Sequence, residues 1–587
     1  MIARKETKMR GARFALMFAA PALLAAVACG ADPVVGDGPD DSDAVVGTGG
    51  DGNPGTGATG NGGGGGGGNP GGSGGSGGSV RPPELPSACE GSKPGSRLLR
   101  RLTQLELMNT HASVFGDAAA AATARLPGDP IEKIRLSNDA ALLSMNQDTA
   151  QAVLDRAEEI ADLVTAQNTL QGQLSCAASS PDETCAGEFI RKYGESLFRK
   201  PLTQTEVDRY LGLHRSVSTA SDFQAGLKWT LVALIQSPYA VYRSELGEGG
   251  KLTPYEIASE LSYDYAGGPP SAELLALAVN GSLNDPEVRY QEAKKLLASE
   301  SGLKVVLKFF EEWADYKTVL TAQRLDTTNQ FEGVRQKMVR ETEQFLQKLL
   351  YEKGGKLPDL LTANYTYADQ QLASYYGFSG GGGDLSNATA TEVQRSYGLG
   401  LFAQGSVTSG MASTTVTSPT KRGLLLLKRL FCETPGLPQA ANIDLGTGDL
   451  EGNTTRERLE RAHLGGPCAE CHAAFDPLGF NFEHIDHVGR YREQEVNSKG
   501  TFPIDATAAV AKLGGVETDG QEELMLALAQ SSEVLSCISG TMSRYVYGSA
   551  GSCRDPQARG RAMAGETSIV DYLAELAREP HFVERLP

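Results

Sequence analysis

The chain is short of positive charge and of long apolar runs. Its 587 residues include 54 lysines and arginines against 72 aspartates and glutamates, a formal net charge of −18. An acidic chain offers no broad electrostatic attraction for phosphate backbones, so nucleic acid is excluded as an expected partner. Beyond the N-terminal region no segment approaches 18 uninterrupted apolar residues. The sequence therefore predicts no later transmembrane helix.

Residues 31–86 have almost no large apolar side chains. Gly, Asp, Ser, Asn and Pro dominate this segment, and residues 62–68 are an uninterrupted run of glycine. A segment of such composition has no means of burying a core. The sequence therefore predicts a disordered tether over residues 29–86, with an end-to-end distance on the order of 40 Å.

The first 28 residues are basic at the start and apolar afterwards. Five lysines and arginines precede the apolar stretch 14–27, which is the order found in signal peptides. Residues 24–29, LAAVAC, resemble a bacterial lipoprotein cleavage box, which implies that Cys29 is acylated and anchors the chain to a membrane. Gly30 then favours the outer membrane, by the same resemblance. Ordinary secretion with cleavage near Ala28 stays open.

Cysteine and histidine are scarce, so their one close cluster is informative. With 9 Cys and 7 His in the chain, chance would produce the C-x-x-C-H sequence of Cys468, Cys471 and His472 about 0.002 times. Thiols at this spacing can bond covalently to haem c while the following histidine ligates the iron. Two other interpretations stay open: structural cysteines with an incidental histidine, and a zinc site completed by His463.

A bound haem would leave one axial position of the iron to be filled. The candidate distal ligands are His463, Met542, His487 and Met411, with an open or water-bound position as the alternative. Methionine more often serves packing than ligation. His484 and His487 are three residues apart and are also consistent with plain surface histidines.

Six cysteines remain once Cys29 and the C-x-x-C-H pair are assigned, and six can pair completely in an oxidising compartment. Two short loops around turn-rich sequence favour the pairs Cys176 with Cys185 and Cys537 with Cys553. The pair Cys89 with Cys432 follows by elimination.

A helix start signal occurs three times. Residues 102–106, 202–206 and 252–256 each place Thr at the N-cap and Glu three positions later, which is a capping box. Apolar periodicity predicts further helices over 148–170, 223–242, 291–313 and 331–351. Strand-like alternation is expected only near 501–510. The predicted fold is mainly α: several packed helical units after the tether, with a cytochrome-c-like Cys/His segment in the C-terminal third.

Two further motifs match known sites poorly. Residues 377–381 fit G-x-S-x-G, but helix-like sequence precedes them where a nucleophile elbow needs a strand. The acidic residues between 442 and 451 lack the spacing of a calcium-binding EF-hand. Catalytic residues therefore stay unknown, and enzymatic activity stays uncertain.

Longer blocks of sequence carry a family resemblance. Residues 468–492, CAECHAAFDPLGFNFEHIDHVGRYR, resemble the signature of exported planctomycete-type and myxobacterial-type proteins. These are built of five consecutive domains of unknown function from the high fifteen-hundreds of that series. Blocks beginning at Arg100, Phe189, Leu252, Thr417 and Ala527 resemble the successive domains. The resemblance implies association with haem or with exported redox systems, without an established activity.

The family pattern also has features around its C-x-x-C-H sequence. A histidine shortly before it is matched by His463, and an Asp-Pro pair after it by Asp476-Pro477. The chain departs from the pattern at Tyr491, where many relatives have Trp, and in having few prolines after Cys432. It also lacks the additional N-terminal cytochrome-like domain of many relatives.

These patterns predict a signal peptide (1–28), a tether (29–86), three helical units (87–175, 176–248 and 249–378), a C-x-x-C-H unit (379–500) and a C-terminal helical unit (501–587). The predicted function is electron transfer or another redox role at the cell envelope, with a redox protein as candidate partner. The alternatives are a surface binding or assembly module, whose polymer or small-molecule substrate is unknown, and a zinc-dependent protein.

Overall fold

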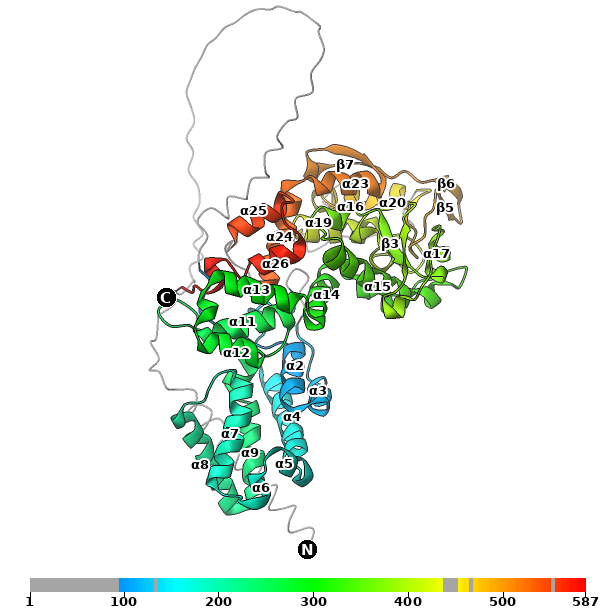
Figure 1. Cartoon of the computed structure of the whole chain (residues 1–587). Helices are drawn as coiled ribbons and strands as arrows, with labels where there is room; N and C mark the ends of the chain where they lie inside the picture. The colour runs from blue at the N-terminus through cyan, green and yellow to red at the C-terminus, as the bar shows by residue number, and fades with distance from the viewer. Residues whose placement is uncertain (1–93, 131–135, 436–451, 464–467, 550–554, 587) are drawn as a thin grey trace, which may run out of the picture. The chain divides into compact units, whose positions relative to one another are not determined.

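The computed structural model describes residues 94–130, 136–435, 452–463, 468–549 and 555–586 (Figure 1). Residues 1–93, which include the predicted signal peptide, the predicted tether, Cys29 and Cys89, lie outside these ranges, and so does Cys553. Contacts group residues 82–587 into one unit. Within it the fold is mainly helical, as the sequence predicts.

The helices divide into three runs along the chain. The first comprises α2 (Gln104–Phe115), α3 (Asp117–Thr123), α4 (Gln147–Thr165), α5 (Gln167–Gln173), α6 (Cys176–Ser179), α7 (Glu183–Phe198), α8 (Gln204–Ala220), α9 (Phe223–Ile235) and α10 (Pro238–Val241). The second comprises α11 (Pro254–Ala266), α12 (Ala272–Val279), α13 (Pro286–Leu297), α14 (Glu300–Ala314), α15 (Phe331–Gln347), α16 (Asp359–Thr362) and α17 (Gln370–Tyr376). The third comprises α18 (Gly405–Gly410), α19 (Pro419–Leu430), α20 (Thr455–His463), α21 (Ala469–His472), α22 (Asp476–Phe480), α23 (Gly520–Ala529), α24 (Ser532–Tyr547), α25 (Pro556–Met563) and α26 (Ile569–Glu575).

The strands of the described ranges pair as four antiparallel two-stranded ribbons. They are β1 (Leu98–Arg101) with β2 (Tyr242–Glu245), β3 (Tyr365–Ala368) with β4 (Thr391–Gln394), β5 (Gln494–Asn497) with β6 (Gly500–Pro503), and β7 (Thr507–Val510) with β8 (Val516–Asp519). Two of these strands, β6 and β7, lie where strand-like alternation is expected. The other ribbons have no comparable alternation in the sequence.

All three predicted capping boxes are confirmed. Thr103, Thr203 and Thr253 each accept a hydrogen bond from the N3 amide, and the N3 glutamate accepts one from the threonine amide. In the third box the amide of Thr253 donates to Glu256 Oε2 at 2.8 Å. The boxes satisfy amides that would otherwise lack a partner at the start of α2, α8 and α11.

Helix interruptions differ from the periodicity prediction. The segment 291–313 spans two helices, because the Ser299 side chain accepts from the Gly302 amide and starts α14. Likewise 148–170 breaks at Ala166, which has an extended ψ of 134°. At the far end of 223–242 the chain turns into β2 after Pro238 opens the short helix α10. Gly377 ends α17 with φ 77°, so the G-x-S-x-G match is a helix end.

One hydrophobic core takes in residues from Leu136 to Phe582. Its members come from each of the predicted units 249–378, 379–500 and 501–587. The earlier helices α4, α7, α8 and α9 pack on one another (Figure 1). Among the described helices none is both long and apolar enough to cross a membrane.

A buried cluster of charges joins distant segments of the chain. Arg100 and Arg243 lie opposite each other in the β1–β2 ribbon, and both guanidinium groups bond to Asp264 Oδ1, at 2.8 and 2.7 Å. Arg585 bonds to Glu245 at 2.8 Å. Burial raises the pKa of Asp264 well above its usual range, with the neighbouring arginines opposing the shift. Because breaking a buried ion pair strands the remaining charge, the cluster holds β1, β2, α11 and Arg585 together.

Candidate functional site

The described residues contain two disulfides. Cys176 pairs with Cys185, as predicted. Cys432 pairs with Cys537, so the predicted pairs Cys537 with Cys553 and Cys89 with Cys432 are wrong. The reason is tertiary: α19 packs against α24 and brings two cysteines 105 residues apart to a Cα separation of 5.6 Å. Stable disulfides indicate an oxidising compartment outside the cytoplasm.

The C-x-x-C-H residues form a single short helical turn. Cys468 is the N-cap of α21, and His472 is the last residue of that helix. Neither Cys468 nor Cys471 belongs to a disulfide, which argues against the interpretation of the pair as structural cysteines bonded to each other. Both side chains are half-buried, and Cys471 packs against the hydrophobic core. The turn therefore presents two thiols and an imidazole close together, at the edge of the core.

Two histidines share one buried carboxylate next to these thiols. Nδ1 of His463 lies 2.7 Å from Asp476 Oδ2, and Nδ1 of His472 lies 3.0 Å from the same atom. The two imidazole centroids are 3.7 Å apart. The side chain of Asp476 is 1% exposed, against 21% and 22% for the histidines. Because a carboxylate accepts and does not donate, each histidine carries its proton on Nδ1 and keeps Nε2 for another ligand.

The geometry fits a metal or haem iron. Ligand atoms of His463, His472 and Asp476 lie within 4.8 Å of one another. Metal-bound histidines usually donate their other ring N–H to a carboxylate or carbonyl, and here Asp476 is that acceptor. The sequence pattern singled out Asp476 only through the Asp-Pro pair. Asp476 also follows His472 by four residues, a spacing that brings side chains together on helical turns, and here the turn between α21 and α22 makes the same contact.

The other candidate distal ligands lie in different surroundings. Met542 lies on the core-facing side of α24 and is only 1% exposed. Met411 lines a small cavity with Phe402 and Leu425. His487 is half-buried, and its Nε2 lies 2.9 Å from the carbonyl oxygen of Leu325.

Only His463, of the four candidates, is shown in contact with His472. An iron between two axial imidazoles would separate their centroids by about 6 Å, given metal–nitrogen distances of about 2 Å. At 3.7 Å the two rings leave no space for a porphyrin between them. Distal ligation by His463 therefore stays a prediction that requires the rings to separate.

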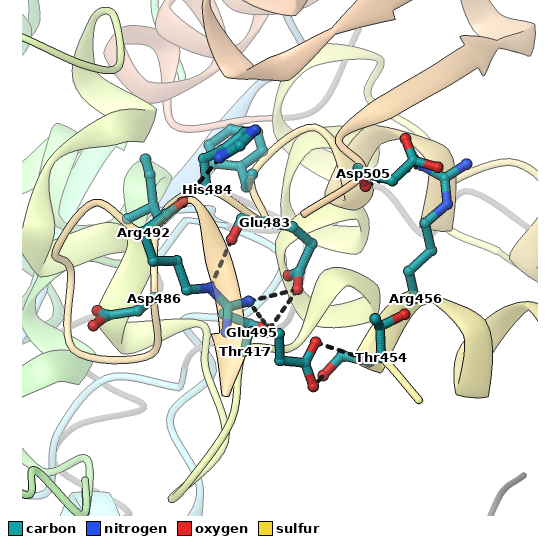
Figure 2. Close-up of polar contacts among 12 residues, drawn as sticks. Thr417, Thr454, Arg456, Glu483, His484, Asp486, Arg492, Glu495 and Asp505 are labelled. Atoms are coloured by element: carbon teal, nitrogen blue, oxygen red, sulfur yellow. Dashed lines mark hydrogen bonds and ion pairs between the residues drawn. The ribbon is translucent and has the colours of Figure 1, made fainter. Parts of the chain in front are cut away.

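Polar contacts hold the start of the helix that carries His463 and the neighbouring segments. Glu495 accepts the amide of Thr455 at 2.8 Å, at the start of α20, whose last residue is His463 (Figure 2). Its neighbour Glu483 accepts from Thr417 and from Arg492, both at 2.8 Å. Burial raises the pKa of Glu483, and the two arginines near it oppose the shift. Glu495 thus holds the start of α20, and Glu483 holds Thr417 in the segment that precedes α19.

His484 lies next to these contacts in the chain and bonds to Arg492. Its ring stacks on Tyr491 at 5.5 Å with an interplanar angle of 9°, and its Nδ1 donates to the carbonyl of Arg492 at 2.9 Å (Figure 2). Because its Nδ1 bonds to a neutral carbonyl and its ring stacks on Tyr491, the structure gives His484 a packing role.

Close backbone packing fixes α22, and with it Asp476. A Cβ atom on Gly423 of α19 would lie 1.8 Å from the carbonyl oxygen of Phe475, and one on Gly479 would lie 1.9 Å from that of Pro419. Arg422 adds hydrogen bonds to the carbonyls of Phe482 and Ile485, at 2.9 and 2.7 Å. Glycine is therefore required at both contacts, and the carboxylate is held on a rigid element.

Three family models match this chain. PSD5, "Protein of unknown function (DUF1595)", covers residues 185–245; PSD4, "Protein of unknown function (DUF1592)", covers 252–378; and PSCyt3, "Protein of unknown function (DUF1588)", covers 398–495. The chain carries three domains of unknown function. The third contains the C-x-x-C-H turn, His463 and Asp476. No curated protein and no solved structure matches the chain.

Proposed function

We propose that the protein is an exported electron-transfer protein whose C-x-x-C-H turn holds one covalently bound haem c. The observation that carries the proposal is the state of His472: its Nδ1 is held by Asp476 while its Nε2 remains for iron, beside two thiols outside any disulfide. The name PSCyt3, given to the domain model over 398–495, suggests a cytochrome-like domain and supports the same chemistry.

The residues present fit this group. Cys468 and Cys471 would supply the two thiols, and Nε2 of His472 would supply a nitrogen ligand. A bound haem would exchange one electron at a time. The chain's own part is to orient the ligand: Asp476 fixes the imidazole, and the Phe475 ring lies 4.8 Å from it on the core side. Partial exposure of His472 suits electron exchange with a partner protein at the surface.

The proposed location is the cell envelope. The two disulfides support an oxidising compartment. The basic and apolar N-terminal residues with Cys29 support export followed by lipid anchoring, and the outer membrane is the proposed site.

Absorption spectroscopy tests the haem. The full chain, produced in a strain competent in cytochrome maturation, should show a Soret band and retain haem after denaturation, with a haem mass on the peptide containing residues 468–472. Cys468→Ser and His472→Gln should reduce or abolish covalent incorporation, whereas the control His484→Gln should leave it unchanged. A wild-type chain without covalent haem would contradict the proposal.

A zinc site is the second candidate, and one observation favours it. The rings of His463 and His472 lie 3.7 Å apart, and because both bond to Asp476 through Nδ1, both Nε2 atoms remain as ligands beside Cys468 and Cys471. Two histidines and two cysteines are a common zinc ligand set. Metal analysis showing one zinc per chain, together with no Soret band, would select this function over the haem.

A further inference from the structure

Asp476 is a buried carboxylate in which one oxygen bonds to two histidines and the other has no hydrogen-bond partner within the described part of the chain. Its Oδ2 accepts from His463 and His472, whereas Oδ1 is buried with no hydrogen-bond partner among the described residues. Burying a charged group without a full set of hydrogen bonds costs folding free energy, so such a group usually has a functional reason. We infer that Asp476 is the positioning residue of this centre, holding His472 as the Nδ1–H tautomer and making it an electron-rich ligand that favours ferric iron.

The tautomer follows from the chain alone. An ionised carboxylate only accepts hydrogen bonds, so both contacts to Oδ2 require a proton on Nδ1. Nε2 of His472 is then the unprotonated nitrogen, which is the form that ligates a metal. This half of the inference holds whether or not haem is bound.

The electronic effect follows from the charge of the acceptor. His484 and His487 donate to neutral backbone carbonyls, whereas His472 donates to a carboxylate. Hydrogen bonds to a charged acceptor are roughly twice as strong as neutral ones, and a carboxylate partner raises the basicity of a ligating imidazole. A more basic ligand stabilises the more highly charged ferric ion. This half rests on the proposed haem function and assigns the centre a low reduction potential.

His463 moderates this effect. It occupies the same oxygen at 2.7 Å, which is closer than His472 at 3.0 Å. The carboxylate therefore divides its negative charge between two donors. The rigid docking of α22 on α19 keeps Asp476 from moving toward either ring.

Nitrogen NMR tests the tautomer without haem. Long-range ¹⁵N–¹H spectra of the full chain, labelled at histidine and produced without cytochrome maturation, should show His472 protonated at Nδ1. His472→Gln assigns the signals. Asp476→Ala should move His472 toward the Nε2–H form. A wild-type His472 protonated at Nε2, or a tautomer unchanged in Asp476→Ala, would overturn the inference, and the wild-type spectrum decides the question even where the variant fails to fold.

Redox titration tests the electronic half. Asp476→Asn keeps the shape of the side chain and should shift the ferric–ferrous equilibrium about tenfold toward ferrous, which is 59 mV for one electron. The control Glu460→Gln removes a carboxylate on α20 that pairs with Arg456, and it should leave the potential near the wild-type value. An unchanged potential in Asp476→Asn, or an equal shift in Glu460→Gln, would overturn the inference. A wild-type chain that binds no haem would instead refute the proposed function and leave the NMR result to judge Asp476.

Discussion

Cys432 is bonded to Cys537, 105 residues later, so the end of α19 is fixed to the middle of α24. The second disulfide of the described ranges, Cys176–Cys185, spans only 9 residues. The longer bridge reaches from the domain that contains the C-x-x-C-H turn to the C-terminal helices. It therefore constrains a much larger part of the unfolded chain.

Removal of the longer bridge should destabilise the protein more than removal of the shorter one. In the chain-entropy account the difference between the two loop lengths corresponds to about 2 kcal/mol in the free energy of unfolding. Urea denaturation of Cys432→Ala/Cys537→Ala should therefore show a lower midpoint than that of Cys176→Ala/Cys185→Ala. Equal midpoints would show that loop length does not set the stabilisation here.

Stability should depend on pH through Glu341. Burial raises its pKa to about 7, opposed by Arg395 and by hydrogen bonds from Thr366 and Tyr376. Between its unfolded pKa near 4.5 and about 7 the folded chain holds a proton that the unfolded chain loses. The free energy of unfolding should thus fall as pH rises through this window, by about 3 kcal/mol in total, and level off above it.

The variant Glu341→Gln should flatten this part of the pH profile. Denaturation midpoints measured from pH 4 to pH 8 provide the comparison, and Glu332→Gln, on the exposed side of the same helix α15, is the control. Parallel profiles for wild type and Glu341→Gln would contradict the assignment.

Each capping box should stabilise the first turn of its own helix. Thr203→Ala removes the side-chain acceptor at the start of α8 and should cost about 1 kcal/mol of local stability. Hydrogen exchange of the amides from 204 to 207 should accelerate accordingly. Thr205→Ala changes an exposed threonine two residues later and should leave those rates nearly unchanged. Acceleration in both variants would point to helix propensity instead.

Loss of His463 should alter the potential of a bound haem in the direction opposite to Asp476→Asn. His463→Phe keeps a ring beside His472 but leaves Asp476 Oδ2 to that residue alone. The hydrogen bond to His472 should strengthen, and the reduction potential should fall. A rise in potential would mean that the positive edge of His463 does not compete for the carboxylate.

Membrane association should depend on Cys29. The variant Cys29→Ser should fractionate away from the outer membrane while its near-ultraviolet circular dichroism stays as in wild type, because serine removes the sulfur that is acylated and otherwise resembles cysteine closely. If the variant still sediments with the outer membrane, another surface of the protein provides the attachment.

Local signals predicted more of this fold than distant contacts did. The three capping boxes were visible because they depend on residues three positions apart. The break at Ser299 was masked by apolar periodicity that continues through it. The Cys432–Cys537 bridge was not predictable, because it depends on the packing of α19 against α24. At the candidate site, the C-x-x-C-H sequence identified Cys468, Cys471 and His472. The contact of Asp476 with both histidines was not predictable, because it depends on the end of α20 lying beside α21.

The ion pair of Arg585 with Glu245 spans 340 residues. A ribosome delivers Glu245 long before it delivers Arg585, and export through a translocation channel from the N-terminus preserves that order. Until Arg585 has been synthesised, Glu245 lacks one of the cations that offset its burial. Burying Glu245 in the paired β1–β2 ribbon before then would cost free energy. The buried cluster is therefore completed only as the last part of this sequence emerges, which delays the final packing of the earliest strand until synthesis has passed residue 585.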